Sequence, residues 1–338
     1  MRSILVFVFL TSSTLAQEKL SPSQVTIQKG ISLENALKII STQSKYQVEA
    51  AEGIRADALK LSFKDKPFWE ALDLLAAEVK GRTYPYGRDG SILILPSTPD
   101  AVLHASYDGP FRTTVERLQS SRNFATGAHT LDAHFEVVWE PGFVPLYFQS
   151  QPQKLICLDE NGKPLGQLVE SSQWNRAYGQ RAVDAKVTLR LNAKALNRAK
   201  SISQLQGELR IRGASGLHQF EFGSLSRLNK SRLPVTRNHQ GASCAVSEVQ
   251  FGRRRWSITI QAKLAPGGPL LESWQAQNWI VNNRLTLSSE KETLTPSSRK
   301  ANVSARSASF VYHFEPPPKL SLSDLKLSYE MPLKLIEV

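Results

Sequence analysis

The period at which apolar residues recur along the chain changes near Phe111, and this change limits the folds that the chain can adopt. Before Phe111, two segments carry apolar residues at i, i+3, i+4 and i+7, the spacing of one helical face. After it, helical stripes nearly vanish, and short alternating runs separated by turn residues take over. We therefore expect an α+β chain, in which a small two-helix domain is followed by mainly antiparallel β-sandwich domains.

Residues 24–95 carry the helical pattern. Ser32 is the expected N-cap of the first helix, and Gly81 is expected to end the second in the left-handed conformation. Alternating segments flank both helices and predict the order β-α-β-β-α-β-β, with both helices on one side of a small sheet. The two stripes are Leu33, Ala36, Leu37 and Ile40, and Phe68, Ala71, Leu72, Leu75 and Val79.

This pattern resembles the secretin and TonB short N-terminal (STN) domain. The residues that carry the resemblance are VTIQKGISLENALKIISTQSKYQVEA and LKLSFKDKPFWEALDLLAAEVKGRTYPYGRDGSILIL. Lys45 stands after the first helix, where such domains often have a glycine. The resemblance implies a small two-helix, β-rich module that contacts another envelope protein. It does not imply a pore or a transport barrel, because the remaining strands lack the length of about 10 residues that membrane barrels use.

The rest of the chain is weakly similar to the β-rich regions of uncharacterised exported bacterial proteins. The segments concerned are VVWEPGFVPLYF, LESWQAQNWIVNN and YEMPLKLIEV. This second resemblance implies no activity.

The N-terminus has the features of a secretory signal peptide. Arg2 provides a positive charge, ILVFVFL an apolar run too short to span a bilayer, and Thr14 and Ala16 the spacing that a signal peptidase recognises. We expect cleavage after Ala16 and export of a chain without transmembrane segments to the periplasm or the exterior. A short N-terminal anchor is the alternative.

Composition shifts divide the remaining residues into domains. We expect an STN-like domain at 17–97, a linker at 98–110, an Ig-like β-sandwich at 111–228 and a second β-rich domain at 229–338. The linker prediction rests on PSTPDAVLHASYDGP, which mixes Pro, Ser, Asp and Gly.

The chain is basic, with 42 Lys and Arg against 30 Asp and Glu and a formal net charge of +12. Such a charge favours anionic neighbours, among them envelope glycans, lipid headgroups and acidic proteins. Export argues against nucleic acid as the partner.

The two cysteines, Cys157 and Cys244, leave two interpretations open. In an exported protein they could form one disulfide. Alternatively, each is a buried free thiol that packs like a small apolar side chain. With no CxxC motif and no Cys/His cluster, a structural zinc site is not expected.

The sequence contains no motif that is typical of a particular catalytic reaction. His129 and His134 are five residues apart, a spacing that fits neither one face of a helix nor one side of a strand. Ser215 lies between glycines without the strand-turn-helix context of a nucleophile elbow. Of the acidic residues, Asp159 and Glu160 fall in an expected hairpin turn, and Glu140 stands beside the turn at Pro141 and Gly142. We therefore expect no enzyme and no cofactor.

Two sets of residues are candidate binding sites. Trp69 and Glu70 lie off the apolar stripe of the second helix, so we expect them to contact a partner. Arg253, Arg254 and Arg255 precede Trp256 and could bind an anionic ligand, although a hairpin turn with exposed charges is the favoured interpretation.

The leading hypothesis is an exported, non-enzymatic protein that contacts another envelope protein through its STN-like module, by a strand edge or a helix face. The alternative is a β-sandwich protein that binds carbohydrate or the cell envelope. Its positive charge and a platform made by Trp174, Trp274 and Trp279 would carry that function.

Overall fold

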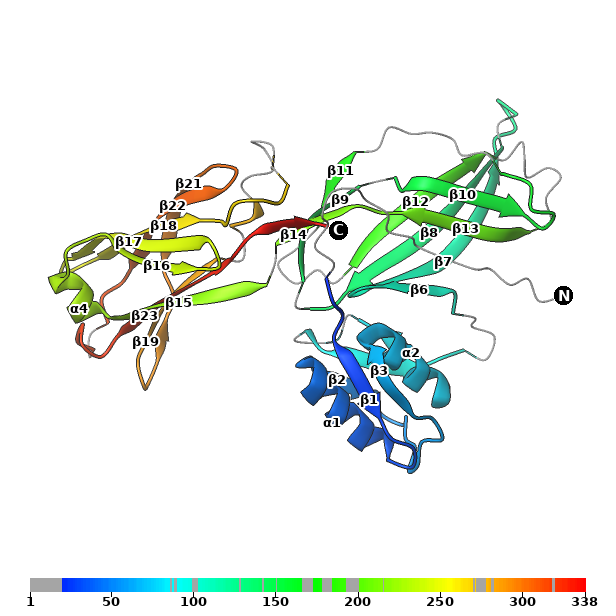
Figure 1. The fold of residues 1–338 in the computed structure, drawn as a ribbon, viewed down its shortest axis with the longest axis horizontal. Helices are drawn as coiled ribbons and strands as arrows, with labels where there is room; N and C mark the ends of the chain where they lie inside the picture. Colours follow the sequence, from blue (N-terminus) through cyan, green and yellow to red (C-terminus); the bar gives the residue numbers. More distant parts are fainter. Residues whose placement is uncertain are drawn as a thin grey trace. The chain divides into compact units, whose positions relative to one another are not determined.

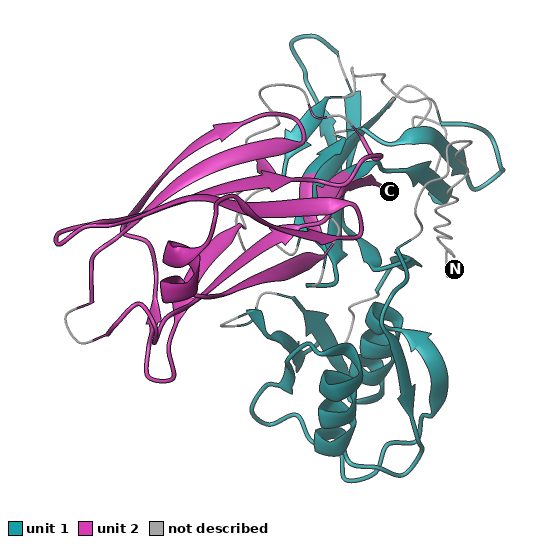
Figure 2. Ribbon diagram, turned by 60° about the vertical axis from the view of Figure 1, so that its left-hand side comes forward, with its two compact units in different colours: residues 1–143, 147–211, 338 teal, residues 144–146, 212–337 magenta. Residues whose placement is uncertain are grey.

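The chain is mainly β-structure, arranged in several antiparallel sheets, as the sequence predicts (Figure 1). The computed structural model describes residues 20–85, 87, 90–98, 103–127, 129–141, 143–149, 151–165, 173–177, 184–192, 201–214, 216–269, 271, 278–280, 283–317 and 320–338. The expected signal peptide lies outside these residues. Two compact units account for the chain: unit 1 comprises Met1–Phe143, Tyr147–Ile211 and Val338, and unit 2 comprises Val144–Leu146 and Arg212–Glu337 (Figure 2).

Unit 1 begins with a small two-helix module, here called the N-terminal module and comprising residues 20–97. Its elements are β1 (Gln24–Ile27), α1 (Leu33–Ser44), β2 (Val48–Ala50), β3 (Phe63–Pro67), α2 (Phe68–Glu78), β4 (Gly81–Tyr84) and β5 (Ile92–Pro96). The expected element order is present, but the strands form two sheets instead of one, β1-β3 and β2-β5-β4. β2 pairs with β5 in parallel, whereas β3 pairs with β1 in an antiparallel ladder.

The ends of the two helices follow from local chemistry. Ser32 caps α1, as expected, by accepting a hydrogen bond on Oγ from the backbone N–H of Asn35 (3.3 Å). Lys45 then adopts φ 64°, the left-handed conformation that a glycine takes without strain. Gly81 does not end α2, because it already belongs to β4. A Cβ there would lie 2.8 Å from Ile94 Cγ2, so this glycine permits the close approach of β4 to β5.

A β-sheet region follows the N-terminal module in unit 1. Its four-stranded sheet has the order β12-β8-β7-β6, and β10 pairs with β13 beside it. The strands of this region are β6 (Ala105–Asp108), β7 (Phe111–Arg122), β8 (His129–Trp139), β10 (Gln153–Asp159), β11 (Trp174–Arg176), β12 (Asp184–Asn192) and β13 (Ile202–Glu208). The residues of β9 (Val144–Gln149) are divided between the two units. The described part of the expected linker is not a linker, because it contains β6, which forms a hairpin with β7.

The N-terminal module and the four-stranded sheet share one core. Trp69 on α2 is 2% exposed, and its Nε1–H donates to the carbonyl oxygen of Pro110 (3.1 Å). Val138 on β8 belongs to the same apolar cluster as the buried faces of α1 and α2. The module is therefore an integral part of unit 1.

A buried ion pair crosses the same junction. Asp73 on α2 accepts hydrogen bonds from Arg112 Nε on β7 (2.7 Å) and from the Tyr107 hydroxyl on β6 (2.7 Å). The Asp73 and Arg112 side chains are 5% and 4% exposed. Removing one partner of such a pair leaves an uncompensated buried charge, which typically costs about 3–5 kcal/mol.

Unit 2 is a β-sandwich. One sheet has the order β15-β23-β19-β20 and the other β16-β17-β18-β22-β21. Tyr329 on β23 packs against Phe310 and Tyr312 on β22, with ring centroids 6.1 and 6.2 Å apart. The elements are β15 (Leu217–Ser224), α4 (Leu225–Lys230), β16 (Val235–His239), β17 (Ala242–Phe251), β18 (Trp256–Lys263), β19 (Arg284–Ser288), β20 (Thr293–Leu294), β21 (Ser298–Val303), β22 (Ser307–Phe314), β23 (Lys326–Pro332) and β24 (Leu335–Glu337). The first residue of β14 (Ile211–Ala214) belongs to unit 1 and the other three to unit 2.

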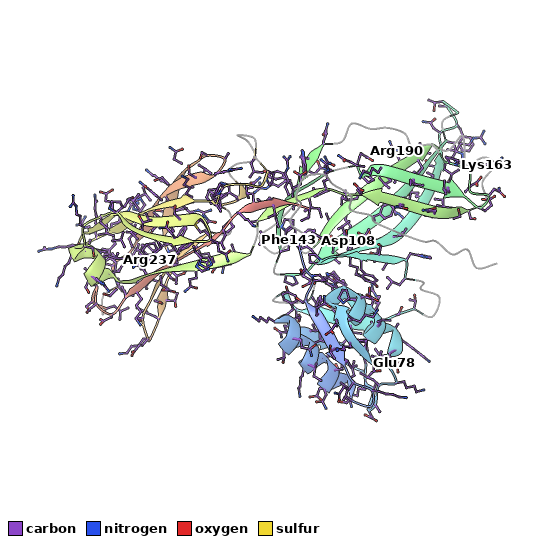
Figure 3. All side chains as sticks on the ribbon, viewed as in Figure 1. Glu78, Asp108, Phe143, Lys163, Arg190 and Arg237 are labelled. Atoms are coloured by element: carbon purple, nitrogen blue, oxygen red, sulfur yellow. The ribbon has the colours of Figure 1, made fainter. Side chains whose placement is uncertain are left out.

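The expected domain boundary at residue 228 falls inside α4. The compact units instead divide between Ile211 and Arg212. The reason is that β15 pairs with β23, near the end of the chain, and so belongs to the sandwich of unit 2. Arg237, labelled in Figure 3, adds a side-chain hydrogen bond from Nε to the carbonyl oxygen of Glu221, between β16 and β15 (3.1 Å).

The substitution Trp69→Ala should strongly destabilise the protein. It removes a large buried side chain and its hydrogen bond to Pro110, a change that typically costs about 3–5 kcal/mol. Leu74→Ala is the matched control on the same helix, because Leu74 is 42% exposed and its loss should change stability by no more than about 0.5 kcal/mol. Denaturant unfolding of the full chain measures both. Equal effects of the two substitutions would contradict the shared core.

Glu140→Gln should remove a pH dependence of stability. Burial raises the pKa of Glu140 despite its hydrogen bonds from Ser23 N and Oγ. The folded protein therefore holds the Glu140 proton more tightly than the unfolded chain does. Its contribution to stability is full below the ordinary Glu pKa and is lost as the pH rises through the raised value. Thermal melts should show wild type losing stability relative to the glutamine variant over that range. A pH-independent difference would refute this assignment.

Candidate functional site

A cleft in the N-terminal module lies between α1, β2 and the loop of residues 51–57. Its volume is about 810 Å³, within the range of ligand-binding clefts. The apolar side chains that line it are Leu33, Leu37, Val48, Ala50, Ala51, Ile54 and Ala56. Ser32, Ser41, Thr42 and charged side chains make up most of the remaining lining, so the cleft has apolar and polar parts.

The edge of β2 forms one side of this cleft. Among the described strands, β2 pairs only with β5, on one side. The carbonyl oxygen of Gln47 and the N–H of Ala51 bond to β5, so in a parallel ladder the backbone groups of Val48 and Ala50 point away from it. The N–H of Val48 donates to Ser41 Oγ on α1 (3.1 Å). The outward carbonyl groups of Val48 and Ala50 and the N–H of Ala50 therefore lie along the cleft.

The edge of β1 is different, because a side chain occupies it. The backbone N–H of Thr26 donates to Gln43 Oε1 (2.9 Å), and Gln43 Nε2 donates to the carbonyl oxygen of Thr26 (3.3 Å). The amide of Gln43 thus satisfies both groups, as a neighbouring strand would. Of these two edges, that of β2 is the one at which a further strand could pair.

The charged side chains around the cleft are mostly acidic. Glu34, Glu49, Glu52 and Asp57 contribute four carboxylates, against two cations from Lys38 and Arg55. Lys38 is paired with Glu34 (2.7 Å), and this hydrogen bond lowers the pKa of the Glu34 carboxyl. The cleft is therefore locally negative on a chain whose net charge is +12.

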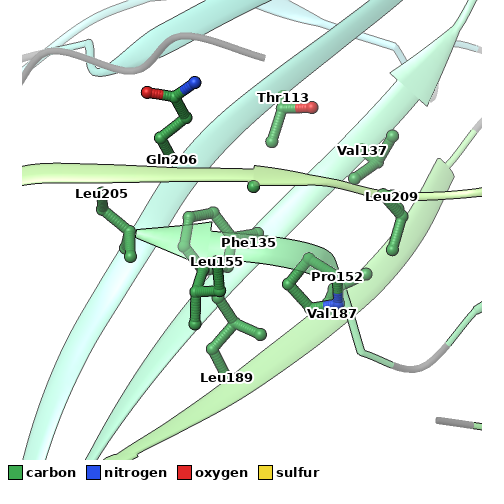
Figure 4. A pocket seen from close by; sticks show the side chains of 11 residues that line it. Thr113, Phe135, Val137, Pro152, Leu155, Val187, Leu189, Leu205, Gln206 and Leu209 are labelled. Atoms are coloured by element: carbon green, nitrogen blue, oxygen red, sulfur yellow. The ribbon is translucent and has the colours of Figure 1, made fainter. Parts of the chain in front are cut away.

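A second cavity lies in the sheet region of unit 1, between β7, β8 and β12 and the β10-β13 pair (Figure 4). Its lining is largely apolar and includes Phe135, Val187 and Leu205. Its volume of about 30 Å³ is that of one or two water molecules. It is therefore a packing gap in a hydrophobic core and not a ligand site.

The predicted partner contact on α2 is wrong for Trp69, which is buried against the four-stranded sheet of unit 1. Glu70 is half-buried and forms an ion pair with Lys66 one turn away (2.6 Å). The off-stripe position of Trp69 reflects a helix that packs on two sides. It does not place the side chain on a docking surface.

The three arginines form the exposed hairpin turn that the sequence predicts. Arg253, Arg254 and Arg255 are exposed in the turn between β17 and β18. The turn is closed by a hydrogen bond from the N–H of Gly252 to the carbonyl oxygen of Arg255 (3.1 Å). Trp256, the next residue, is buried and makes an edge-to-face contact with Phe251.

The cysteines do not form the disulfide that the sequence left open. Both are free and buried, Cys157 on β10 in unit 1 and Cys244 on β17 in unit 2. Burial raises the pKa of Cys157 to about 11 and raises that of Cys244 as well. Both therefore behave as small apolar side chains of the cores.

The structure does not bring the two candidate metal ligands, His129 and His134, together in one site. His129 bonds to Ser120 Oγ (2.7 Å), and His134 bonds to Thr188 Oγ1 (3.0 Å). No group of three or more His, Cys, Asp or Glu side chains suited to a metal occurs in the described part of the chain. Ser215 lies outside the described residues. A search of the described residues also finds no helix long and apolar enough to cross a membrane.

The expected tryptophan platform finds little support. Trp279 is 1% exposed, and its Nε1–H donates to the carbonyl oxygen of Ser304 (3.2 Å). Trp174 is half-buried on β11, and Trp274 lies outside the described residues.

No family model, curated protein or solved structure matches the chain in comparisons with known proteins. The sequence predicted a partner contact on α2, whereas the strand edge that is open to a partner lies on β2. The alternation around Val48 marked β2 as a strand, but nothing local to it indicated which strand it would join.

Alkylation should find both cysteines protected in the folded protein and reactive after unfolding. The reason is that each thiol is buried and protonated at neutral pH. Intact mass after iodoacetamide treatment, without reductant, should show no adducts under native conditions and two in denaturant. A denatured, non-reduced sample that takes up no label would instead establish a disulfide.

Proposed function

We propose that this chain is an exported, non-enzymatic protein whose STN-like module binds an extended segment of another envelope protein. In this proposal a signal peptide is cleaved after Ala16, and the mature protein acts in the periplasm or outside the cell. The partner strand pairs with the open edge of β2 and lies in the cleft beside α1. The observation that carries the proposal is this unpaired edge along a cleft of about 810 Å³.

The chemistry of the cleft supports strand addition. The outward carbonyl groups of Val48 and Ala50 and the N–H of Ala50 supply main-chain hydrogen bonds, which give affinity without regard to sequence, whereas the N–H of Val48 already donates to Ser41 Oγ. Apolar side chains of Leu37 and Ile54 offer contact for alternate side chains of the added strand. The surplus of carboxylates favours a partner segment with basic side chains. The resemblance to STN domains adds an independent reason to expect a protein partner.

Ala50→Pro should abolish partner binding without unfolding the module. Proline removes the outward N–H of Ala50, and because this group points away from β5, no ladder bond is lost. Ala50→Ser is the matched control, because it keeps the N–H at the same position. A photo-crosslinking residue placed at Thr42 or Glu52 in the full chain, in cells that make the protein, measures binding. We expect one envelope protein to be trapped, the adduct to persist with Ala50→Ser and to disappear with Ala50→Pro.

A crosslinker at Lys64 tests whether trapping is specific, because Lys64 is exposed on β3 and does not line the cleft. Equal trapping from Lys64, or trapping that survives Ala50→Pro, would refute strand addition at β2. The absence of any adduct from the cleft positions would refute the proposed partner site itself.

A further inference from the structure

The outward face of the five-stranded sheet in unit 2 is rich in uncharged polar side chains. The registers of β17, β18, β22 and β21 align these side chains in rows across the sheet. The first row runs Gln250, Ser257, His313 and Ser298, all exposed or half-buried. The opposite face of the same strands carries buried residues such as Ile258, so the alternation along each strand defines the outward face.

The following rows continue this chemistry. Gln261, Ser309 and Asn302 form one row, and Lys263 and Ser307 lie opposite each other in the next. The row between these and the first runs Glu248, Thr259, Val311 and Lys300. Hydroxyl and amide groups both donate and accept hydrogen bonds, so an array of them can follow the hydroxyl groups of a sugar chain.

The carboxylate in these rows is already satisfied within the protein. Glu248 accepts hydrogen bonds from Gln250 Nε2 (2.6 Å) and from Thr259 Oγ1 (3.5 Å). It is therefore occupied by neighbouring side chains, whereas Lys263 and Lys300 add positive charge to the rows.

One end of this face is strongly cationic. The exposed arginine turn, Arg253, Arg254 and Arg255, continues directly from the first row, because Gln250 and Ser257 stand opposite each other next to the closing pair of the hairpin. Burial lowers the pKa of His313, and the charges of Arg255 and Lys300 lower it further. The buried Nδ1 of His313 has no hydrogen-bond partner in the described structure.

We propose that this face and its arginine turn together bind an anionic polysaccharide. The rows of hydroxyl and amide groups hydrogen-bond the sugars, and the arginines and Lys300 pair with carboxylate groups along the polymer. The described large apolar side chains that are exposed lie on other strands and segments, so the face has no group to insert into a lipid bilayer. The one tryptophan in the described strands of this sheet, Trp256, is buried on the opposite face, so recognition depends on charge and hydrogen bonds and not on ring stacking.

The test uses the full chain and polygalacturonate as the probe, with dextran of matched length as the neutral control. Calorimetry should detect binding to polygalacturonate that weakens as salt is added, and none to dextran. The triple variant R253Q/R254Q/R255Q should weaken the apparent Kd roughly tenfold or more, because it removes three exposed ion pairs. The variant K29Q/K60Q/K64Q removes the same charge from exposed positions of the N-terminal module and should bind as wild type does.

Several outcomes would overturn the proposal. They are no binding to polygalacturonate, equal losses in the two triple variants, tighter binding to phosphatidylglycerol vesicles, or equally tight binding to single-stranded DNA. The vesicle result would assign the turn to a lipid headgroup, and the DNA result would reduce it to a general polyanion contact. Ala50→Pro should bind polygalacturonate normally, so a failure here is distinguishable from a failure of the strand-addition proposal.

Discussion

The buried contact of Asp73 with Arg112 and Tyr107 is the constraint on which the arrangement of unit 1 depends. Two charges are removed from water, and this is favourable only where the geometry is close and hydrogen bonds compensate the lost hydration. The 2.7 Å contacts meet that condition, although one Asp73 oxygen, Oδ1, is buried without a partner. The carboxylate lies on α2 and its partners lie on β6 and β7. Separation of the N-terminal module from the four-stranded sheet would therefore leave the Asp73 and Arg112 charges unpaired.

This ion pair also explains why the two helices could be predicted from the sequence, whereas the elements that pack against α2 could not. The stripes of α1 and α2 are local, and both helices occur where the sequence placed them. A stripe marks one buried face, however, and α2 buries a second one that includes Trp69 and Asp73. Local spacing cannot show that a sheet about 40 residues further along the chain will cover that second face. A buried Asp on a helix is the one signal that could have indicated it, since such a residue needs a partner.

Strand pairing also determines which of the candidate binding features could be predicted from the sequence. The arginine turn could be placed from the sequence, because a hairpin brings together neighbouring segments. The open edge of β2 could not, since its existence depends on the parallel pairing of β2 with β5 and on the side chain of Gln43 closing the edge of β1. The outward rows of the unit 2 sheet depend likewise on the register of β22 with β18 and β21, which alternation alone does not fix.

Local charge, and not the net charge of +12, therefore determines which partners each surface can accept. A basic chain would be expected to attract anions everywhere, yet the cleft beside α1 has a surplus of carboxylates. Exposed charges act over about 8–10 Å at physiological ionic strength, so each surface presents its own sign to a ligand in contact with it. An anionic polymer is disfavoured at the β2 edge, and a basic peptide is disfavoured at the arginine turn. The two ligands proposed above have opposite charge and would therefore not compete for one surface.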